Sequence, residues 1–165
     1  IAFMTDELKK LIFSPKISNV FNSYNWIINI DSKKNFHSYF VGEIADYYLN
    51  IYNDKDKICF QFTLDIEIPN SKTTELLSLI NVANQYSIEG FFVFDFKVMK
   101  IKYNLIKPYS LIVEERYMYE FLKSKLILIG NLFYNFVSGF HNLIYGEKIE
   151  DASLELLFLT NEGCA

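Results

Sequence analysis

The stretch that decides the fold is residues 57–68, which read KICFQFTLDIEI. Every even-numbered position from Ile58 to Ile68 is apolar, whereas the odd-numbered positions are mostly polar. Because successive side chains of a strand point to opposite faces, this alternation predicts a β-strand with one buried face and one wet face. Such strands are typical of antiparallel sheets covered on one side only. The sequence therefore predicts an α+β fold, with helices packed on one face of a single antiparallel sheet.

The residues before this stretch predict a helix followed by strands. Residues 1–13 are expected to form an N-terminal arm or a short helix. A second helix is expected to begin at Ser14-Pro15, because Ser can cap a helix and Pro is tolerated at its first position. It continues to about Asn25, since four apolar residues up to Tyr24 fall on one stripe. Strands are then predicted at residues 26–30, 39–44 and 47–52.

The residues after it predict a helix, two strands, a long helix and a short helix. These elements are expected at residues 72–86, 91–99, 100–106, 113 to about 141, and 151–160. The strand at 91–99 is expected to place four apolar side chains, Phe92, Phe94, Phe96 and Val98, on one face. No repeat, low-complexity tract or linker divides the chain. Residues 14–165 are therefore predicted to form a single domain.

The net charge of −4 argues against a nucleic-acid partner, which needs clustered Lys and Arg to neutralise phosphates. Arg116 is the single arginine, and the 18% aromatic content fits AT-rich codons better than a binding site. Cys59 and Cys164 are expected to be free thiols, which favours a cytoplasmic location. The chain begins with Ile1 rather than Met, so the sequence leaves open whether its first three residues are native.

No pattern in the sequence predicts catalysis, a metal site or a cofactor. His37 and His141 stand alone, and a hydrolase that uses Cys59 or His141 is a weak hypothesis because nothing local supports a triad. Asp65 and Glu67 share one face of a strand, but a solvated strand face looks the same. Metal-binding and phosphate-loop spacings are absent from the sequence. We therefore expect a protein that is not an enzyme and needs no cofactor.

The second half of the long helix carries no charge from residue 126 to residue 145, which raises the question of a membrane span. A polar stripe at helical spacing argues against a span, and amphipathic packing explains it better. The stripe consists of Asn131, Asn135, Ser138 and Asn142.

That stripe runs beside a row of apolar side chains, a combination unusual for a solvated helix face. A partner-binding or dimer face is one interpretation, and a helix buried on the sheet is the other. The predicted partner-binding residues are Ile129, Phe133, Phe136, Phe140, Asn131 and Asn135.

A resemblance adds to this interpretation. The passage INVANQYSIEGFFVFDF, residues 80–96, carries Ile80-Asn81, Asn84 and Gly90-Phe91-Phe92 at the crossing from helix to strand. With the order of elements, Asp151-Ala152 and the closing LFLTNEGCA, it resembles the YbjN-type family of bacterial proteins over about residues 14–165.

The resemblance implies a fold similar to type III secretion chaperones and a role as a sensory-transduction regulator, with no established catalytic residues. Chaperones of that fold bind extended protein segments and often dimerise. The leading hypothesis is therefore a cytoplasmic, non-enzymatic adaptor, chaperone-like or regulatory, that binds another protein or itself. The alternative is a small-molecule-binding domain with an apolar pocket lined by Phe92, Phe94, Phe96 and Phe133.

Overall fold

A computed structural model describes residues 6–87, 89–108, 119–120, 123–124, 136–146, 148 and 151, with side chains described from residue 15 onward. Its elements are α1 (Asp6–Ser23), β1 (Asn29–Ile30), β2 (Phe36–Phe40), β3 (Tyr47–Asp54), β4 (Lys57–Leu64), the 3₁₀ turn η1 (Asn70–Lys72), α2 (Thr73–Tyr86), β5 (Phe91–Asp95) and β6 (Lys100–Pro108). Residues 136–144 form a further helical segment.

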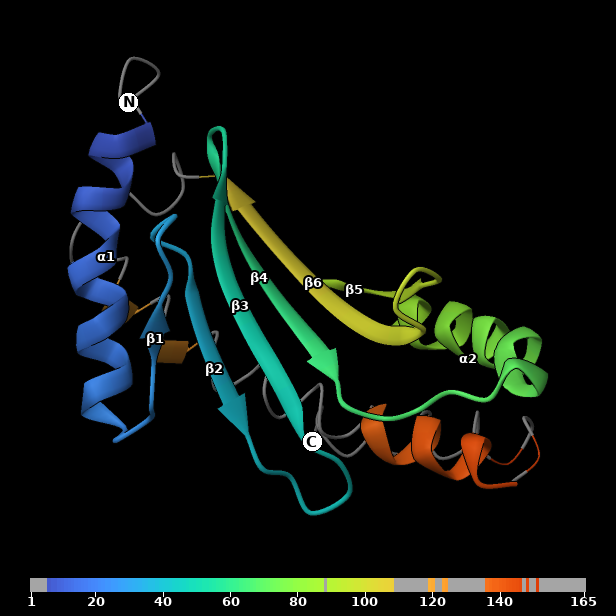
Figure 1. Cartoon of the computed structure of the whole chain (residues 1–165). Coiled ribbons are helices and arrows are strands. Elements are labelled where there is room, and N and C mark those ends of the chain that lie inside the picture. The colour runs from blue at the N-terminus through green and yellow to red at the C-terminus, as the bar shows by residue number, and fades with distance from the viewer. Residues whose placement is uncertain are drawn as a thin grey trace.

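Six strands of the described chain form one sheet in the order β1-β2-β3-β4-β6-β5, with every neighbouring pair antiparallel. Figure 1 shows α1 at the β1 end of this sheet and α2 at the β5 end. The predicted α+β class and the single antiparallel sheet are confirmed. The strand predicted at residues 57–68 corresponds to β4, which ends at Leu64, four residues earlier than predicted, and lies inside the sheet between β3 and β6.

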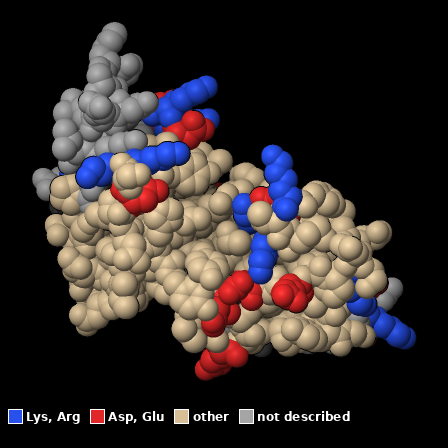
Figure 2. All heavy atoms as spheres, in the orientation of Figure 1, with Lys and Arg blue, Asp and Glu red and all other residues tan. Residues whose placement is uncertain are grey.

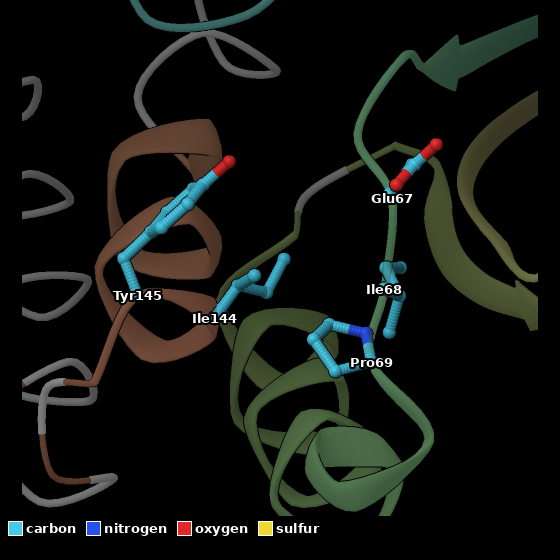
Figure 3. Close-up of a pocket in the computed structure, with 5 residues that line it drawn as sticks. All are labelled: Glu67, Ile68, Pro69, Ile144 and Tyr145. Carbon is cyan, nitrogen blue, oxygen red and sulfur yellow. The ribbon is translucent and has the colours of Figure 1, made fainter.

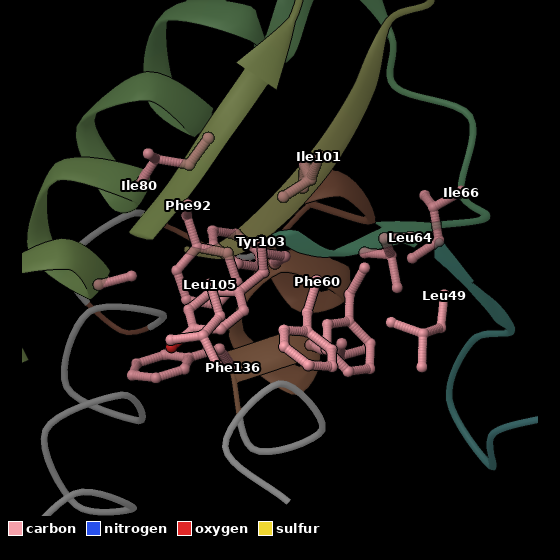
Figure 4. Packing of buried hydrophobic residues seen from close by; sticks show 14 of the residues in the cluster. Leu49, Phe60, Leu64, Ile66, Ile80, Phe92, Ile101, Tyr103, Leu105 and Phe136 are labelled. Atoms are coloured by element: carbon pink, nitrogen blue, oxygen red, sulfur yellow. The ribbon is translucent and has the colours of Figure 1, made fainter. Parts of the chain in front are cut away.

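One face of the sheet is buried beneath the helices. In β4, Ile58, Phe60, Phe62 and Leu64 are at most 2% exposed, as the alternation predicts. The same core cluster contains buried residues of α1, α2 and residues 136–144. Figure 4 shows part of this cluster, with Phe136 beside side chains of β4, β5 and β6. We call this side the inner face, and the opposite side the outer face.

The helix break predicted at Ser14-Pro15 is wrong, because α1 runs through Pro15 as one helix. A proline inside a helix removes one backbone N–H donor and kinks the helix, but it need not end it. Ile17, Val20 and Phe21 lie after the proline with at most 2% exposure, so burial holds this part of the helix in place. The predicted boundary between residues 13 and 14 therefore falls inside α1, and the single domain over 14–165 stays a prediction.

The strand predicted to reach residue 99 ends earlier, at Asp95. The Asp95 carboxylate accepts a hydrogen bond from the Lys97 N–H at 3.0 Å, and Met99 has a positive φ of 52°. Together they form the tight turn into β6. Phe96 and Val98 lie in this turn and are 61% and 54% exposed, so the prediction that they share one strand face with Phe92 and Phe94 is wrong.

Gly90, one of the residues that carry the resemblance, has a packing role. A Cβ atom at this position would lie 2.5 Å from the Tyr103 ring and hydroxyl and 2.6 Å from the Asn104 carbonyl oxygen. Tyr103 is fully buried, and its hydroxyl lies 3.2 Å from Ser87 Oγ. Only glycine leaves room here for Tyr103 and Asn104 of β6 beside the start of β5.

Candidate functional site

The outer face of the sheet carries a row of polar side chains, one imidazole and three amides, that crosses four strands. Strand register places Asn50 of β3 between His37 of β2 and Gln61 of β4, and Gln61 opposite Asn104 of β6. His37 Nδ1 lies 2.7 Å from Asn50 Oδ1, and Gln61 Nε2 donates to Asn104 Oδ1 at 3.0 Å. We call these four residues the amide row. It is an ordered set of hydrogen-bonding groups held by the strands themselves.

A group of exposed apolar and aromatic side chains lies beside the amide row, at the β2 end of the sheet. Tyr39 and Tyr48 are opposite each other in register, with ring centroids 4.8 Å apart and exposed fractions of 45% and 44%. Val41 follows β2 and is 81% exposed, and Ile27 is 78% exposed. The Ile27 carbonyl accepts a hydrogen bond from Ser38 Oγ at 2.6 Å, which places Ile27 beside β2. We call these four residues the exposed apolar group: Ile27, Tyr39, Val41 and Tyr48.

The Tyr39 ring is held in place by Asp46. Its hydroxyl donates to the Asp46 carboxylate, which also accepts from the Gly42 N–H at 3.2 Å. This hydrogen bond to a carboxylate raises the pKa of Tyr39 to about 12. Tyr39 therefore remains a neutral, oriented aromatic side chain throughout the physiological pH range.

Two lysines on the other half of the outer face are paired with carboxylates. Lys100 Nζ lies 3.0 Å from Asp65 Oδ1, and Lys102 Nζ lies 2.7 Å from Asp95 Oδ2. The bond from Lys102 lowers the pKa of Asp95 below its usual value. Figure 2 shows charged side chains in separate groups, with wide uncharged areas between them. Asp65, considered above as half of a carboxylate pair, is thus an ion-pair partner of Lys100.

The residues considered for nucleophilic catalysis do not come together. Cys59 lies on β4 with 4% exposure, and burial raises the pKa of its thiol, which disfavours the nucleophilic thiolate. His37 is engaged by Asp31 and Asn50, and His141 packs against the Tyr145 ring with centroids 4.4 Å apart. Odd-numbered residues of β4 point to the outer face, whereas the helix that carries His141 packs on the inner face. Among the described residues, no group of three His, Cys, Asp or Glu side chains is arranged to hold a metal ion.

Two of the predicted partner-binding residues belong to the core. Phe136 and Phe140 are 2% and 0% exposed, and both pack edge to face on Phe92, with centroids 5.1 and 5.2 Å apart. The alternative interpretation, a helix buried on the sheet, is therefore correct for these two phenylalanines. The other four predicted residues lie outside the described part of the chain; they are Ile129, Phe133, Asn131 and Asn135.

The aromatic pocket predicted for a small molecule stays a prediction, and the structure describes three of its four phenylalanines. Phe92 is buried among other rings, and Phe94 is 8% exposed. Phe96 packs edge to face on Phe94 from the solvent side, with ring centroids 4.8 Å apart. Phe133, the fourth predicted lining residue, lies outside the described residues.

A shallow pocket of about 510 Å³ lies elsewhere. Figure 3 shows Ile68 and Pro69, on the segment that follows β4, facing Ile144 and Tyr145. Glu67 supplies a carboxylate at its rim. One carboxylate with four largely apolar neighbours defines no particular ligand.

Comparison of the chain with family models, curated proteins and solved structures found no match. The likeness to the YbjN-type family therefore stays a prediction from the sequence. Within the described residues, no helix has the length and apolar character needed to cross a membrane.

Sequence reasoning missed the outer face as a site. The side chains themselves are visible in the sequence, because the residues between those that point inward in residues 47–52 and 57–68 include Tyr48, Asn50 and Gln61. Their placement in one row depends on strand order and register, which the alternation alone does not fix.

Proposed function

We propose that this protein is a non-enzymatic, cytoplasmic adaptor, chaperone-like or regulatory, that binds another protein through the outer face of its sheet. The observation that carries the proposal is the exposed apolar group beside the amide row. Solvated strand faces usually carry Lys, Glu and Thr, whereas the centres of protein interfaces are rich in aromatic side chains and poor in charge. Ile27 and Val41, each more than three-quarters exposed, add aliphatic surface that burial by a partner would stabilise.

The proposed contact surface has the parts of a protein interface. Tyr39 and Tyr48 supply rigid aromatic contacts, and the amide row supplies hydrogen-bonding groups that a partner must match. The ion pairs of Lys100 and Lys102 border this surface on the β6 side. The resemblance to chaperone-like proteins supports the same class of function, and a second copy of the chain is one partner to be tested.

Affinity capture followed by cross-linking and mass spectrometry tests this function. The tagged full chain is compared with Val41→Lys and Tyr48→Lys, which place a charge in the exposed apolar group without disturbing the core. Val98→Lys is the matched control, because Val98 is 54% exposed but lies in the turn between β5 and β6. Circular dichroism establishes that all variants are folded.

We expect a stoichiometric protein partner, cross-linked to Lys102 or Lys57 near the outer face, that Val98→Lys retains. Each outer-face variant should weaken its binding about tenfold or more, which corresponds to about 1.4 kcal/mol or more. Size measurement of the purified protein decides whether the partner is a second copy. Equal binding by all folded variants would refute the proposed surface, and a co-purified small molecule with no protein would refute the adaptor function.

A further inference from the structure

The imidazole ring of His37 lies between two hydrogen-bond acceptors. Its Nε2 is 2.9 Å from Asp31 Oδ2, and its Nδ1 is 2.7 Å from Asn50 Oδ1. A carboxylate and an amide oxygen only accept hydrogen bonds, so both ring nitrogens must carry a proton in this arrangement. This arrangement matches the imidazolium form of His37, in which both ring nitrogens donate.

The Asp31 carboxylate is fixed by its own turn. Its Oδ1 accepts from the backbone N–H groups of Lys33 and Asn35 at 2.8 and 2.9 Å, and its Oδ2 accepts from Asn35 Nδ2 at 3.2 Å. Rotation of the carboxylate away from His37 would break these bonds. Asp31 therefore remains an acceptor for His37 Nε2–H in both protonation states.

The proton that leaves His37 is consequently the one on Nδ1. Without it, a lone pair on Nδ1 faces the Asn50 amide oxygen at hydrogen-bond distance, and the two acceptors repel each other. Rotation of the Asn50 amide by about 180° removes this conflict, because Nδ2–H₂ then donates to Nδ1. The rotation needs no movement of β3, since the carbonyl and amino groups of an amide have nearly the same shape.

We propose that His37 and Asn50 form a pH switch on the outer face of the sheet. When His37 is protonated, Asn50 presents its amino group, a donor, to the rest of the amide row; when His37 is neutral, Asn50 presents its carbonyl, an acceptor. Asn50 lies between His37 and Gln61 in the strand register, so the change occurs inside the proposed binding surface. The switch itself does not depend on the proposed function, but its effect on a partner does.

The surroundings of His37 suit such a switch. Its side chain is 42% exposed, so protons exchange with water freely. Asp31 is the charged residue that acts on the His37 ring. Lys33 and Lys34 belong to the same turn as Asp31, and their side chains are exposed. The strand neighbours of His37, Asn29 of β1 and Asn50 of β3, are uncharged. Two hydrogen bonds raise the pKa of His37 above 6.5, and the bond to Asp31 has a larger effect than the bond to Asn50. The pH at which His37 loses its proton is therefore higher than that of an unperturbed histidine.

A nuclear magnetic resonance titration of the full chain tests the switch. The ring nitrogens of both histidines and the side-chain amide of Asn50 are followed from pH 5.5 to 9. We expect His37 to lose the Nδ1 proton and keep the Nε2 proton, and the Asn50 amide resonances to shift with the same midpoint. His141, which packs on the Tyr145 ring, is the internal control, and the Asn50 resonances should follow those of His37 alone.

Two variants make the test specific. Asp31→Asn should lower the pKa of His37 and move the Asn50 transition with it, whereas Asn50→Leu should leave a titrating His37 with no coupled change in the row. Loss of the Nε2 proton instead, or Asn50 resonances that stay constant through the His37 transition, would overturn the switch. A third outcome separates the switch from the proposed function. If Asn50 switches as expected but partner binding does not depend on pH, the result counts against the proposed contact surface and not against the switch.

Discussion

The Asn84 side chain makes two hydrogen bonds to the backbone of Phe92. Its Oδ1 accepts from the Phe92 N–H at 2.6 Å, and its Nδ2 donates to the Phe92 carbonyl oxygen at 2.9 Å. Phe92 lies on β5, which is the last strand in the sheet order and, among the described strands, pairs with β6 alone. The asparagine therefore satisfies the backbone groups that point away from the sheet, as a neighbouring strand would. It also covers part of an edge that could otherwise pair with a second chain.

Replacement of Asn84 should destabilise the protein and expose this edge. We expect Asn84→Ala to lower the free energy of unfolding by about 1–3 kcal/mol, because two part-buried backbone groups lose their partner. Asn81→Ala, at an exposed position of the same helix, is the control and should stay within about 0.5 kcal/mol of the wild type. Urea denaturation measures both, and light scattering should detect more aggregation of Asn84→Ala. Equal stability of the two variants would contradict the role of Asn84.

A methyl group at Gly90 should be poorly tolerated. Gly90→Ala places a Cβ against Tyr103 and the Asn104 carbonyl oxygen, so we expect a loss of about 1–3 kcal/mol in denaturation experiments. Tyr103→Phe removes the hydroxyl, which contacts Ser87 and the Gly90 backbone, and should cost less, about 1 kcal/mol. The double variant Gly90→Ala with Tyr103→Phe should remain destabilised, because the contact with the backbone oxygen persists. Full recovery in the double variant would show that the hydroxyl alone causes the conflict.

Phe140 and Phe96 should differ sharply in their importance for stability. Phe140→Ala removes a fully buried ring that packs on Phe92, and we expect it to cost about 3–5 kcal/mol. Phe96→Ala removes a largely exposed ring that packs on Phe94. We expect it to lower the free energy of unfolding by about 0.5–1.5 kcal/mol. Thermal and urea unfolding compare the two. A similar cost for both would mean that residues 136–144 do not complete the core as described.

The alternation in β4 was sufficient to predict the class of fold. In β4, Ile58, Phe60, Phe62 and Leu64 are buried because one face of this inner strand packs on the core, and the same logic gave the one-sided sheet. Cys59 is the exception, because it is buried although it points to the outer face. The alternation did not predict where a strand ends when the local backbone geometry turns the chain. The apolar alternation continues through Phe96 and Val98, but Asp95 and the positive φ of Met99 turn the chain there.

The outer face could not be predicted as a site because it depends on register. Asn50, Gln61 and Asn104 are far apart in sequence, and nothing local indicates that they line up. The order β4-β6-β5 brings Asn104 next to Gln61, whereas sequence order would have placed β5 there. The contact between His37 and Asp31 likewise depends on the turn that Asp31 itself organises.

The hydrogen bonds of His37 should also make stability depend on pH. The pKa of His37 is raised in the folded protein, so its contribution to stability is complete below the unfolded pKa of about 6.5 and is lost as the pH rises through the folded pKa. Over this range Asp31 stays ionised, because its pKa is lowered mainly by the bond from His37. We expect the difference in unfolding free energy between wild type and His37→Gln to be largest near pH 5.5 and to decrease toward pH 9. Urea denaturation across this range measures it, and His141→Gln serves as the control for the other histidine. A difference that grows with pH would mean that the folded protein favours the neutral form of His37, opposite to the geometry described here.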